Sequence, residues 1–128
     1  MRKVILMVVL TGVSGSAVAE WLAVDENKIR TTYANQATIR KKGNIVEMWE
    51  LRDFKSVQAE VEGEPYRSIM IQKEYDCKKG QYRIPTYSYH SESMGEGKIV
   101  AAGSKPGGWR VVTPGSVVEA LWKLACGK

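Results

Sequence analysis

The sequence RSIMIQKEYDC, from Arg67 to Cys77, has the clearest β-strand pattern in the chain. One face of this segment carries apolar residues at a period of two, interrupted only by Lys73; they are Ile69, Ile71, Tyr75 and Cys77. The opposite face is polar and carries Ser68, Gln72, Glu74 and Asp76. The pattern predicts a strand that buries one face and directs Cys77 toward the core.

The C-terminal residues change to a helical pattern. Ser116 and Glu119 have capping-box spacing, directly after Pro114 and Gly115. The apolar residues that follow occupy one helix face at i, i+3, i+4 and i+7; they are Val118, Leu121, Trp122 and Ala125. Cys126 lies at the border of this face, and Gly127 suits the residue after the helix. We therefore predict an amphipathic helix that ends at Cys126.

The two cysteines, Cys77 and Cys126, are 49 positions apart and form no CxxC redox motif. With a single histidine in the chain they are too few for a structural zinc site. In an exported protein an even cysteine count favours a disulfide, and the alternative is two free thiols. Because one cysteine faces inward from a strand and the other ends a helix, a bridge would hold the helix on the sheet.

The first nineteen residues have the pattern of a secretory signal peptide. Arg2 and Lys3 precede an apolar run, and small residues end the segment before a predicted cleavage between Ala19 and Glu20. The apolar run is too short to span a bilayer, which is the alternative interpretation. Neither cysteine lies at this junction, so we expect no lipid anchor on an N-terminal cysteine and a periplasmic or secreted location.

Removing the first 19 of 128 residues leaves 109, which is enough for one domain over residues 20–128. No second apolar segment has membrane length, so we expect no transmembrane segment in the mature chain. Losing Arg2 and Lys3 lowers the net charge from +5 to +3. This mild excess is compatible with an acidic envelope surface or polysaccharide and does not predict a nucleic-acid partner.

The rest of the chain alternates short β-candidates with turn residues. We predict strands at residues 21–24, 29–34, 45–54, 67–77, 81–90, 98–102 and 109–112. Residues 35–39 suggest a turn or single helical turn, and residues 58–65 suggest a polar loop. Pro85 places an edge or a bulge in the strand at 81–90. The predicted fold class is α+β, with a small antiparallel sheet of about six strands and the C-terminal helix packed on it.

Aromatic residues suggest where the domain binds. Tyr87 and Tyr89 share a predicted strand face with Arg83, and tyrosine with arginine is typical of protein interfaces. The alternative is an amphipathic sheet face that neighbouring segments half cover. Most of the four tryptophans, by contrast, are expected in the core, since a small domain needs large apolar side chains to fill it.

Catalytic and cofactor motifs do not occur in the sequence. His90 lies among serines and tyrosines in the stretch from Tyr87 to Ser93, but no nucleophile elbow, HExxH, P-loop or GxGxxG accompanies it. We therefore predict neither an enzyme, nor a metal site, nor a cofactor, and interpret His90 as a polar residue at a strand end.

The ordered set of aromatic, glycine and cysteine positions resembles the surface-adhesin protein E family over nearly the whole mature chain. The residues that carry the resemblance are Trp21, Tyr33, Ala37 to Arg40, Gly43, Trp49, Leu51, Tyr75 to Cys77, Met94, Gly95, Trp109, Pro114 to Ser116, and Leu124 to Cys126. The resemblance implies an antiparallel sheet tied to a C-terminal helix, and a non-enzymatic role in binding host matrix or envelope proteins. It also implies homodimers. A periplasmic housekeeping protein with an unidentified partner is the alternative.

Overall fold

The alternating segment becomes strand β4, Glu64–Asp76, in the middle of one antiparallel sheet. The computed structural model describes residues 20–128, so the predicted signal peptide and Ala19 lie outside the described part of the chain. The sheet has seven strands: β1 to β6 follow in chain order, and β7 pairs with β5. Their bounds are Trp21–Glu26, Arg30–Lys42, Ile45–Val61, Glu64–Asp76, Gln81–His90, Ile99–Gly103 and Arg110–Val111.

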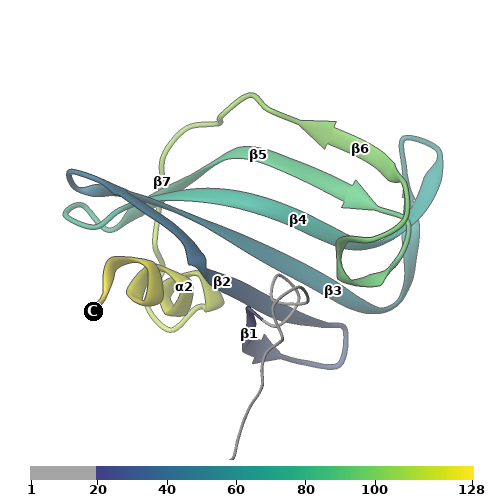
Figure 1. Ribbon diagram of the computed structural model, residues 1–128, viewed down its shortest axis with the longest axis horizontal. Coiled ribbons are helices and arrows are strands. Elements are labelled where there is room, and N and C mark those ends of the chain that lie inside the picture. Colours follow the sequence, from purple (N-terminus) through teal and green to yellow (C-terminus); the bar gives the residue numbers. More distant parts are fainter. Residues whose placement is uncertain (1–19) are drawn as a thin grey trace, which may run out of the picture.

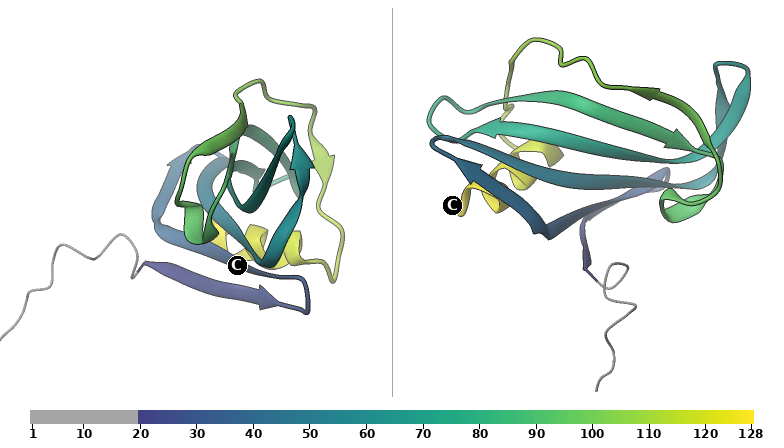
Figure 2. Two further views of the ribbon diagram at one scale, coloured as in Figure 1. Left: turned by 90° about the vertical axis from the view of Figure 1, so that its right-hand side faces the viewer. Right: turned by 45° about the horizontal axis from the view of Figure 1, so that its top comes forward.

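The sheet curls, and helix α2, Val117–Cys126, lies against its inner face near one end (Figures 1 and 2). A short 3-10 helix, η2 (Ser93–Gly95), follows β5. The Ser116 hydroxyl accepts a hydrogen bond from the Glu119 amide, and Gly127 ends the helix in a left-handed conformation. The α+β class, the antiparallel sheet and the C-terminal helix are confirmed.

Residues 58–65 form a hairpin, so the prediction of a loop there is wrong. Strand β3 runs to Val61 and β4 begins at Glu64, joined through Glu62 and Gly63, whose φ angles are both positive. Two central residues with positive φ are typical of the tight turn that joins antiparallel strands. The segment is polar because this end of the hairpin is largely exposed, not because it leaves the sheet.

Residues 35–39 interrupt the β2–β3 ladder without ending β2. The register shifts between Asn35 and Arg40, and the Asn35 side chain accepts a hydrogen bond from the Ala37 amide. The Thr38 hydroxyl donates to the Asn35 carbonyl and accepts from the Trp49 amide, which restores a bond to the neighbouring strand. The predicted turn is thus an irregularity inside one long strand.

The helix end of the inner face contains the larger hydrophobic cluster. Its buried members come from β2, β3, β4 and α2; they are Ala34, Val46, Met48, Tyr75, Leu121 and Ala125. The other end contains a smaller cluster of Phe54, Ile69 and Ile71, with Tyr66, Ile84 and Tyr89 packed against it. Helix α2 covers only the first cluster, so the second depends on aromatic side chains and on the chain that follows β6 for its cover.

A buried ion pair lies on the inner face between the two clusters. Glu50 Oε1 is 2.9 Å from Lys73 Nζ, and the two side chains are 1% and 3% exposed. Glu50 Oε2 also accepts a hydrogen bond from Arg52 Nε at 3.1 Å. Burial lowers the pKa of Lys73, and the Glu50 carboxylate opposes this shift by stabilising the ammonium. Glu50 and Lys73 therefore each stabilise the charged form of the other.

The outer face of β3 carries the residues that the alternation groups together, Ile45, Glu47, Trp49 and Leu51. Only Leu51 is fully buried, because η2 lies over it and Gly95 closely approaches Met70 beside it. The expectation of a largely buried set of tryptophans is wrong: Trp21, Trp49 and Trp122 are half-buried, and Trp109 is 36% exposed. The core relies instead on Met48, Tyr75 and Leu121.

The predicted disulfide is present between Cys77 and Cys126, whose Cα atoms are 5.7 Å apart. Beside it, the Trp122 indole donates a hydrogen bond to the Asp76 carbonyl at 3.1 Å. A covalent and a polar link thus join the last turns of α2 to the end of β4. Both cysteines pack against the helix-side cluster, so the bridge holds the helix where it covers apolar side chains.

We expect Cys126→Ser to lower the melting temperature strongly. Closing a loop of this length stabilises a domain by about 4 kcal/mol, which corresponds to a shift of about 15 °C or more. Thermal unfolding of the exported protein followed by circular dichroism measures the shift. The reduced wild type is the control and should melt with the variant; equal melting temperatures of the variant and the oxidised wild type would contradict the prediction.

We expect Lys73→Met to cost about 3–5 kcal/mol of unfolding free energy, since it leaves the Glu50 carboxylate buried beside Arg52 alone. The double variant Glu50→Met/Lys73→Met should recover most of this loss, because no unpaired charge remains inside. Urea unfolding of both variants measures the difference. A double variant less stable than Lys73→Met would show that the pair itself, and not the unpaired charge, sets the cost.

Candidate functional site

A bulge in β5 separates the residues that the sequence places on one face. Arg83 pairs with Glu74, but Thr86 pairs with Gln72, so three steps along β5 match two along β4. The extra residue falls at Ile84 and Pro85, where the proline predicts an edge or bulge. It reverses the alternation, so Tyr87 and Tyr89 face inward opposite Ile71 and Ile69, whereas Arg83 faces outward beside Glu74. A shared face for all three residues is therefore wrong.

The outward side of this bulge holds a compact charged stack. Arg83 Nε donates to Glu74 Oε1 at 2.6 Å, and its guanidinium lies 4.6 Å from the centre of the Trp109 ring. Trp109 directly precedes β7, which pairs with Gln81 and Tyr82. The Glu74 carboxylate neutralises the charge of Arg83. Through its contact with the Trp109 ring, Arg83 holds the segment that leads into β7 against β5.

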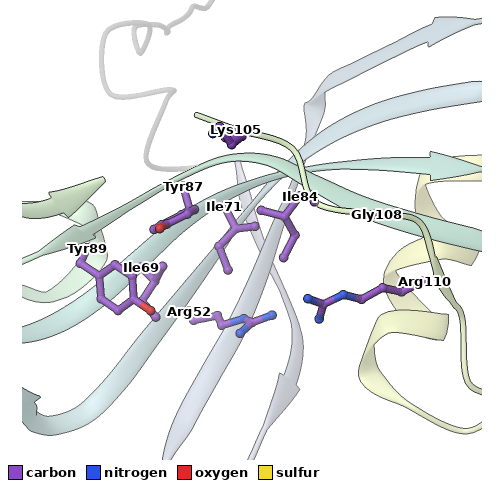
Figure 3. Close-up of a pocket in the computed structure, with 10 residues that line it drawn as sticks. Arg52, Ile69, Ile71, Ile84, Tyr87, Tyr89, Lys105, Gly108 and Arg110 are labelled. Atoms are coloured by element: carbon purple, nitrogen blue, oxygen red, sulfur yellow. The ribbon is translucent and has the colours of Figure 1, made fainter. Parts of the chain in front are cut away.

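The inward side of the bulge opens into a pocket of about 310 Å³ (Figure 3). Three isoleucines and two tyrosines form the sheet side of the pocket; they are Ile69, Ile71, Ile84, Tyr87 and Tyr89. The segment between β6 and β7 forms the other side with Lys105, Gly107 and Gly108. Arg52 and Arg110 complete the lining, which contains three cations and no acidic residue.

The pocket exists because β5 loses its neighbour opposite the bulge. Gly103 of β6 pairs with Tyr87, and Arg110 of β7 pairs with Tyr82. Six residues, 104–109, connect β6 to β7, whereas only four residues of β5, 83–86, lie between the two paired regions. The connecting segment is therefore too long to continue the ladder, and it passes over the inner face of the sheet. The Thr86 hydroxyl bonds the Gly103 carbonyl where the gap begins. The same gap that interrupts the ladder therefore admits solvent to the second hydrophobic cluster.

The tyrosines of the pocket belong to a chain of edge-to-face rings. Tyr66 contacts Tyr89 at 4.7 Å between ring centres, and Tyr89 contacts Tyr87 at 5.8 Å. Burial raises the pKa of Tyr89, so its hydroxyl stays protonated and can donate a hydrogen bond. Tyr87 lies over Gly103, where a Cβ atom would be 2.6 Å from the ring. A glycine at this edge thus leaves space for the exposed tyrosine.

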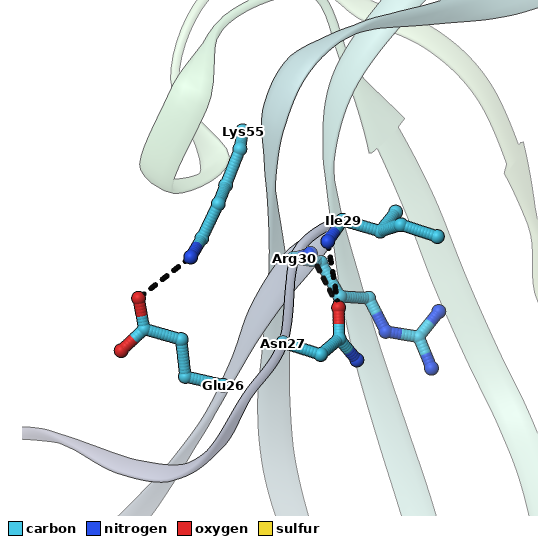
Figure 4. Close-up of polar contacts among 5 residues, drawn as sticks. All are labelled: Glu26, Asn27, Ile29, Arg30 and Lys55. Atoms are coloured by element: carbon cyan, nitrogen blue, oxygen red, sulfur yellow. Dashed lines mark hydrogen bonds and ion pairs between the residues drawn. The ribbon is translucent and has the colours of Figure 1, made fainter.

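The turn between β1 and β2 positions a further cation, Arg30 (Figure 4). The Asn27 side chain accepts hydrogen bonds from the Ile29 and Arg30 amides, and Glu26 pairs with Lys55 at 2.7 Å. Arg30 then lies over Phe54 on the inner face. Burial lowers the pKa of Arg30, and the nearby Arg52 shifts it in the same direction, whereas Glu50 and Asp25 oppose the shift.

Ser88 and His90 are brought together, two residues apart on the outer face of β5. The Ser88 hydroxyl is 2.8 Å from His90 Nε2. His90 Nδ1 is buried, and no residue within 20–128 hydrogen-bonds it. A general base would need an acceptor at Nδ1 to orient the ring and stabilise its charge. The pair therefore has the contact of a catalytic dyad but not its electrostatics, and burial lowers the pKa of His90.

No group of three or more histidine, cysteine or acidic side chains within 20–128 is arranged to hold a metal ion. None of the helices there is long and apolar enough to cross a bilayer.

A family model and several solved structures match this chain. The family model described as surface-adhesin protein E matches residues 21–127. Two crystal forms of Haemophilus influenzae protein E superpose with TM-scores of 0.67 and 0.69, each at 16% identity over 85% of this chain and over 85% and 88% of the other. Protein E from non-typeable H. influenzae gives 0.61, at 17% identity over 80% of this chain and 72% of the other. No curated protein sequence matches the chain.

We expect His90 to make stability depend on pH. Because burial lowers its pKa in the folded state, the unfolded chain takes up a proton first as the pH falls. The stabilisation present above the unfolded pKa, about 6.5, is lost as the pH decreases through the folded value. Urea unfolding at pH 7.5 and 5.0 should show a larger loss in the wild type than in His90→Gln. Equal losses would contradict the prediction.

Proposed function

The chain belongs to the surface-adhesin protein E family, and on this premise we propose that it is an exported binding module without catalytic activity. Its ligand in this proposal is a protein of the cell envelope or of a host matrix. The fold of H. influenzae protein E supports the architecture, but at 16% identity it supports no ligand residue. The proposal therefore rests on the side chains that this chain exposes to solvent.

The observation that carries the proposal is an exposed aromatic and cationic edge beside β5. We call it the β5 edge surface; it consists of Tyr87, where pairing with β6 ends, and of Trp109, Arg110 and Val111, where the chain returns to β5. Tyr87 and Trp109 are 38% and 36% exposed, and Val111 is 70% exposed. Tyrosine, tryptophan and arginine supply most of the energy at the centres of protein interfaces. Arg83 supports this surface from the outer side through Trp109.

Export and cleavage between Ala19 and Glu20 are part of the same proposal. A disulfide that joins sheet and helix fits an oxidising compartment. Surface display, however, requires passage beyond the periplasm, and the predicted junction carries no cysteine for a lipid anchor. A periplasmic housekeeping protein with an envelope partner is the second candidate, and fractionation of cells that express the full chain distinguishes the two.

Homodimers are a further element of the proposal. Strands β1 and β6 each pair with only one neighbour within residues 20–128, so each leaves one side of its backbone available to a second copy. Sedimentation of the exported protein measures this state directly.

We expect Tyr87→Ala/Trp109→Ala to weaken capture of a protein partner by about tenfold or more, since anchors of this kind each contribute more than 1 kcal/mol. The exported protein is immobilised and exposed separately to envelope extract and to purified matrix proteins. Leu22→Ala/Val57→Ala is the matched control, because both residues are exposed and apolar but lie outside the β5 edge surface. Equal capture by the two double variants would remove this surface as the binding site.

A further inference from the structure

The two guanidinium groups of the pocket face one another, and no acidic residue lines the pocket. In Figure 3 the side chains of Arg52 and Arg110 extend from opposite sides of the pocket toward a common point. Arg52 Nε is bonded to Glu50, which leaves the terminal nitrogens of its guanidinium available. Arg110 has neither a hydrogen bond nor an ion pair with any side chain in the described part of the chain, 20–128. Two like charges in a partly enclosed site repel each other, and an anion between them would remove this cost.

The nearest carboxylate, that of Glu50, cannot act as the anion between Arg52 and Arg110. Glu50 is 1% exposed, and its two oxygens already interact with Lys73 and Arg52. Its position below Arg52 holds that guanidinium in place while the other side of the group faces the pocket. Lys105 adds a third positive charge from the segment that covers the site. Arg52 thus shares one carboxylate with Lys73, and neither Lys105 nor Arg110 forms an ion pair within residues 20–128, so the positive charge around the open volume is only partly neutralised.

The remaining walls of the pocket are apolar. Ile69, Ile71 and Ile84 line the sheet side, next to the rings of Tyr87 and Tyr89. A volume of about 310 Å³ is at the lower end of the range for sites that bind small molecules. Inorganic anions would leave this apolar wall without a contact. Flat, forked guanidinium groups match the two oxygens of a carboxylate.

We propose that this pocket binds a small organic carboxylate, with its oxygens between Arg52 and Arg110 and its apolar body against Ile69, Ile71 and Ile84. The Tyr89 hydroxyl is placed to donate a further hydrogen bond from the side wall. This site goes beyond the proposed protein-binding function and does not depend on it, because it needs no second macromolecule.

Phenylacetate is a suitable probe, since it joins one carboxylate to one small ring. Calorimetric titration of the exported protein should show saturable binding at a single site, and the amide signals of Gly107 and Gly108 should shift in NMR spectra of the labelled protein. The neutral analogue phenylacetamide should not bind. Arg110→Gln should weaken phenylacetate binding by about tenfold or more, because it removes a charged hydrogen-bond donor.

Arg40→Gln is the matched control, because Arg40 is an exposed arginine of β2 that does not line the pocket. Phenylacetate affinity should be unchanged in this variant. Lys105→Gln, in the covering segment, gives a second test if Arg110→Gln loses its fold. No saturable binding, or equal affinity in the wild type and in a folded pocket variant, would overturn the proposal. Inorganic sulfate that binds as tightly as phenylacetate would overturn the role of the apolar wall.

Because these titrations use purified protein alone, they fail or succeed independently of partner capture. Loss of phenylacetate binding in Lys105→Gln with capture unchanged would separate the pocket from the protein-binding surface, because Lys105 lines the pocket but is not part of the β5 edge surface.

Discussion

The Glu50 carboxylate, buried in the middle of the inner sheet face, is the constraint around which the rest of the structure is arranged. It binds Lys73 on the neighbouring strand and Arg52 on its own strand. A buried carboxylate with two cationic partners cannot be moved without exposing an unpaired charge to an apolar interior. It therefore divides the inner face into two parts. Helix α2 and the disulfide complete the part on one side, and the cationic pocket occupies the part on the other side.

The β5 bulge gives the second part its chemistry. One extra residue at Ile84 and Pro85 reverses the alternation, which turns two tyrosines inward and leaves Arg83 with Glu74 on the outside. At the same place four positions of β5 have no ladder partner in β6 or β7, and the connecting segment leaves the ladder there. Bulges are common beside functional sites because they redirect side chains and end strand pairing at the same place. Both effects are needed here, since the tyrosines form the wall and the interruption forms the opening.

Most of the fold could be predicted from local pattern, and most of the pocket could not. Period-two alternation in β4, the bounds of β5 and the capping box of α2 depend on residues close in sequence, so they can be predicted from the sequence alone. The two cysteines could be placed for the same reason. Arg52, Lys105 and Arg110 come from three distant segments and meet only because of strand register and the bulge. Pro85 indicates a bulge in the sequence. That the bulge places Arg83 and Tyr87 on opposite faces of the sheet is clear only from the pairing of β5 with β4.

The position of the helix explains why a binding site could arise on this face at all. A curled sheet of this size has a long inner surface, and a helix of ten residues covers only the end where Leu121 and Ala125 pack. The hydrophobic remainder would have to be filled by side chains, covered by a loop, or left accessible. Aromatic rings fill part of it, and the 104–109 segment covers part of it. The space left between them is lined by three cations, of which only Arg52 has a carboxylate partner within residues 20–128, and it shares that partner with Lys73. Stability requires neither that space nor that charge, since apolar side chains would serve folding better. Their presence beside an exposed tyrosine is the structural reason to look for function at this end of the sheet and not at the disulfide end.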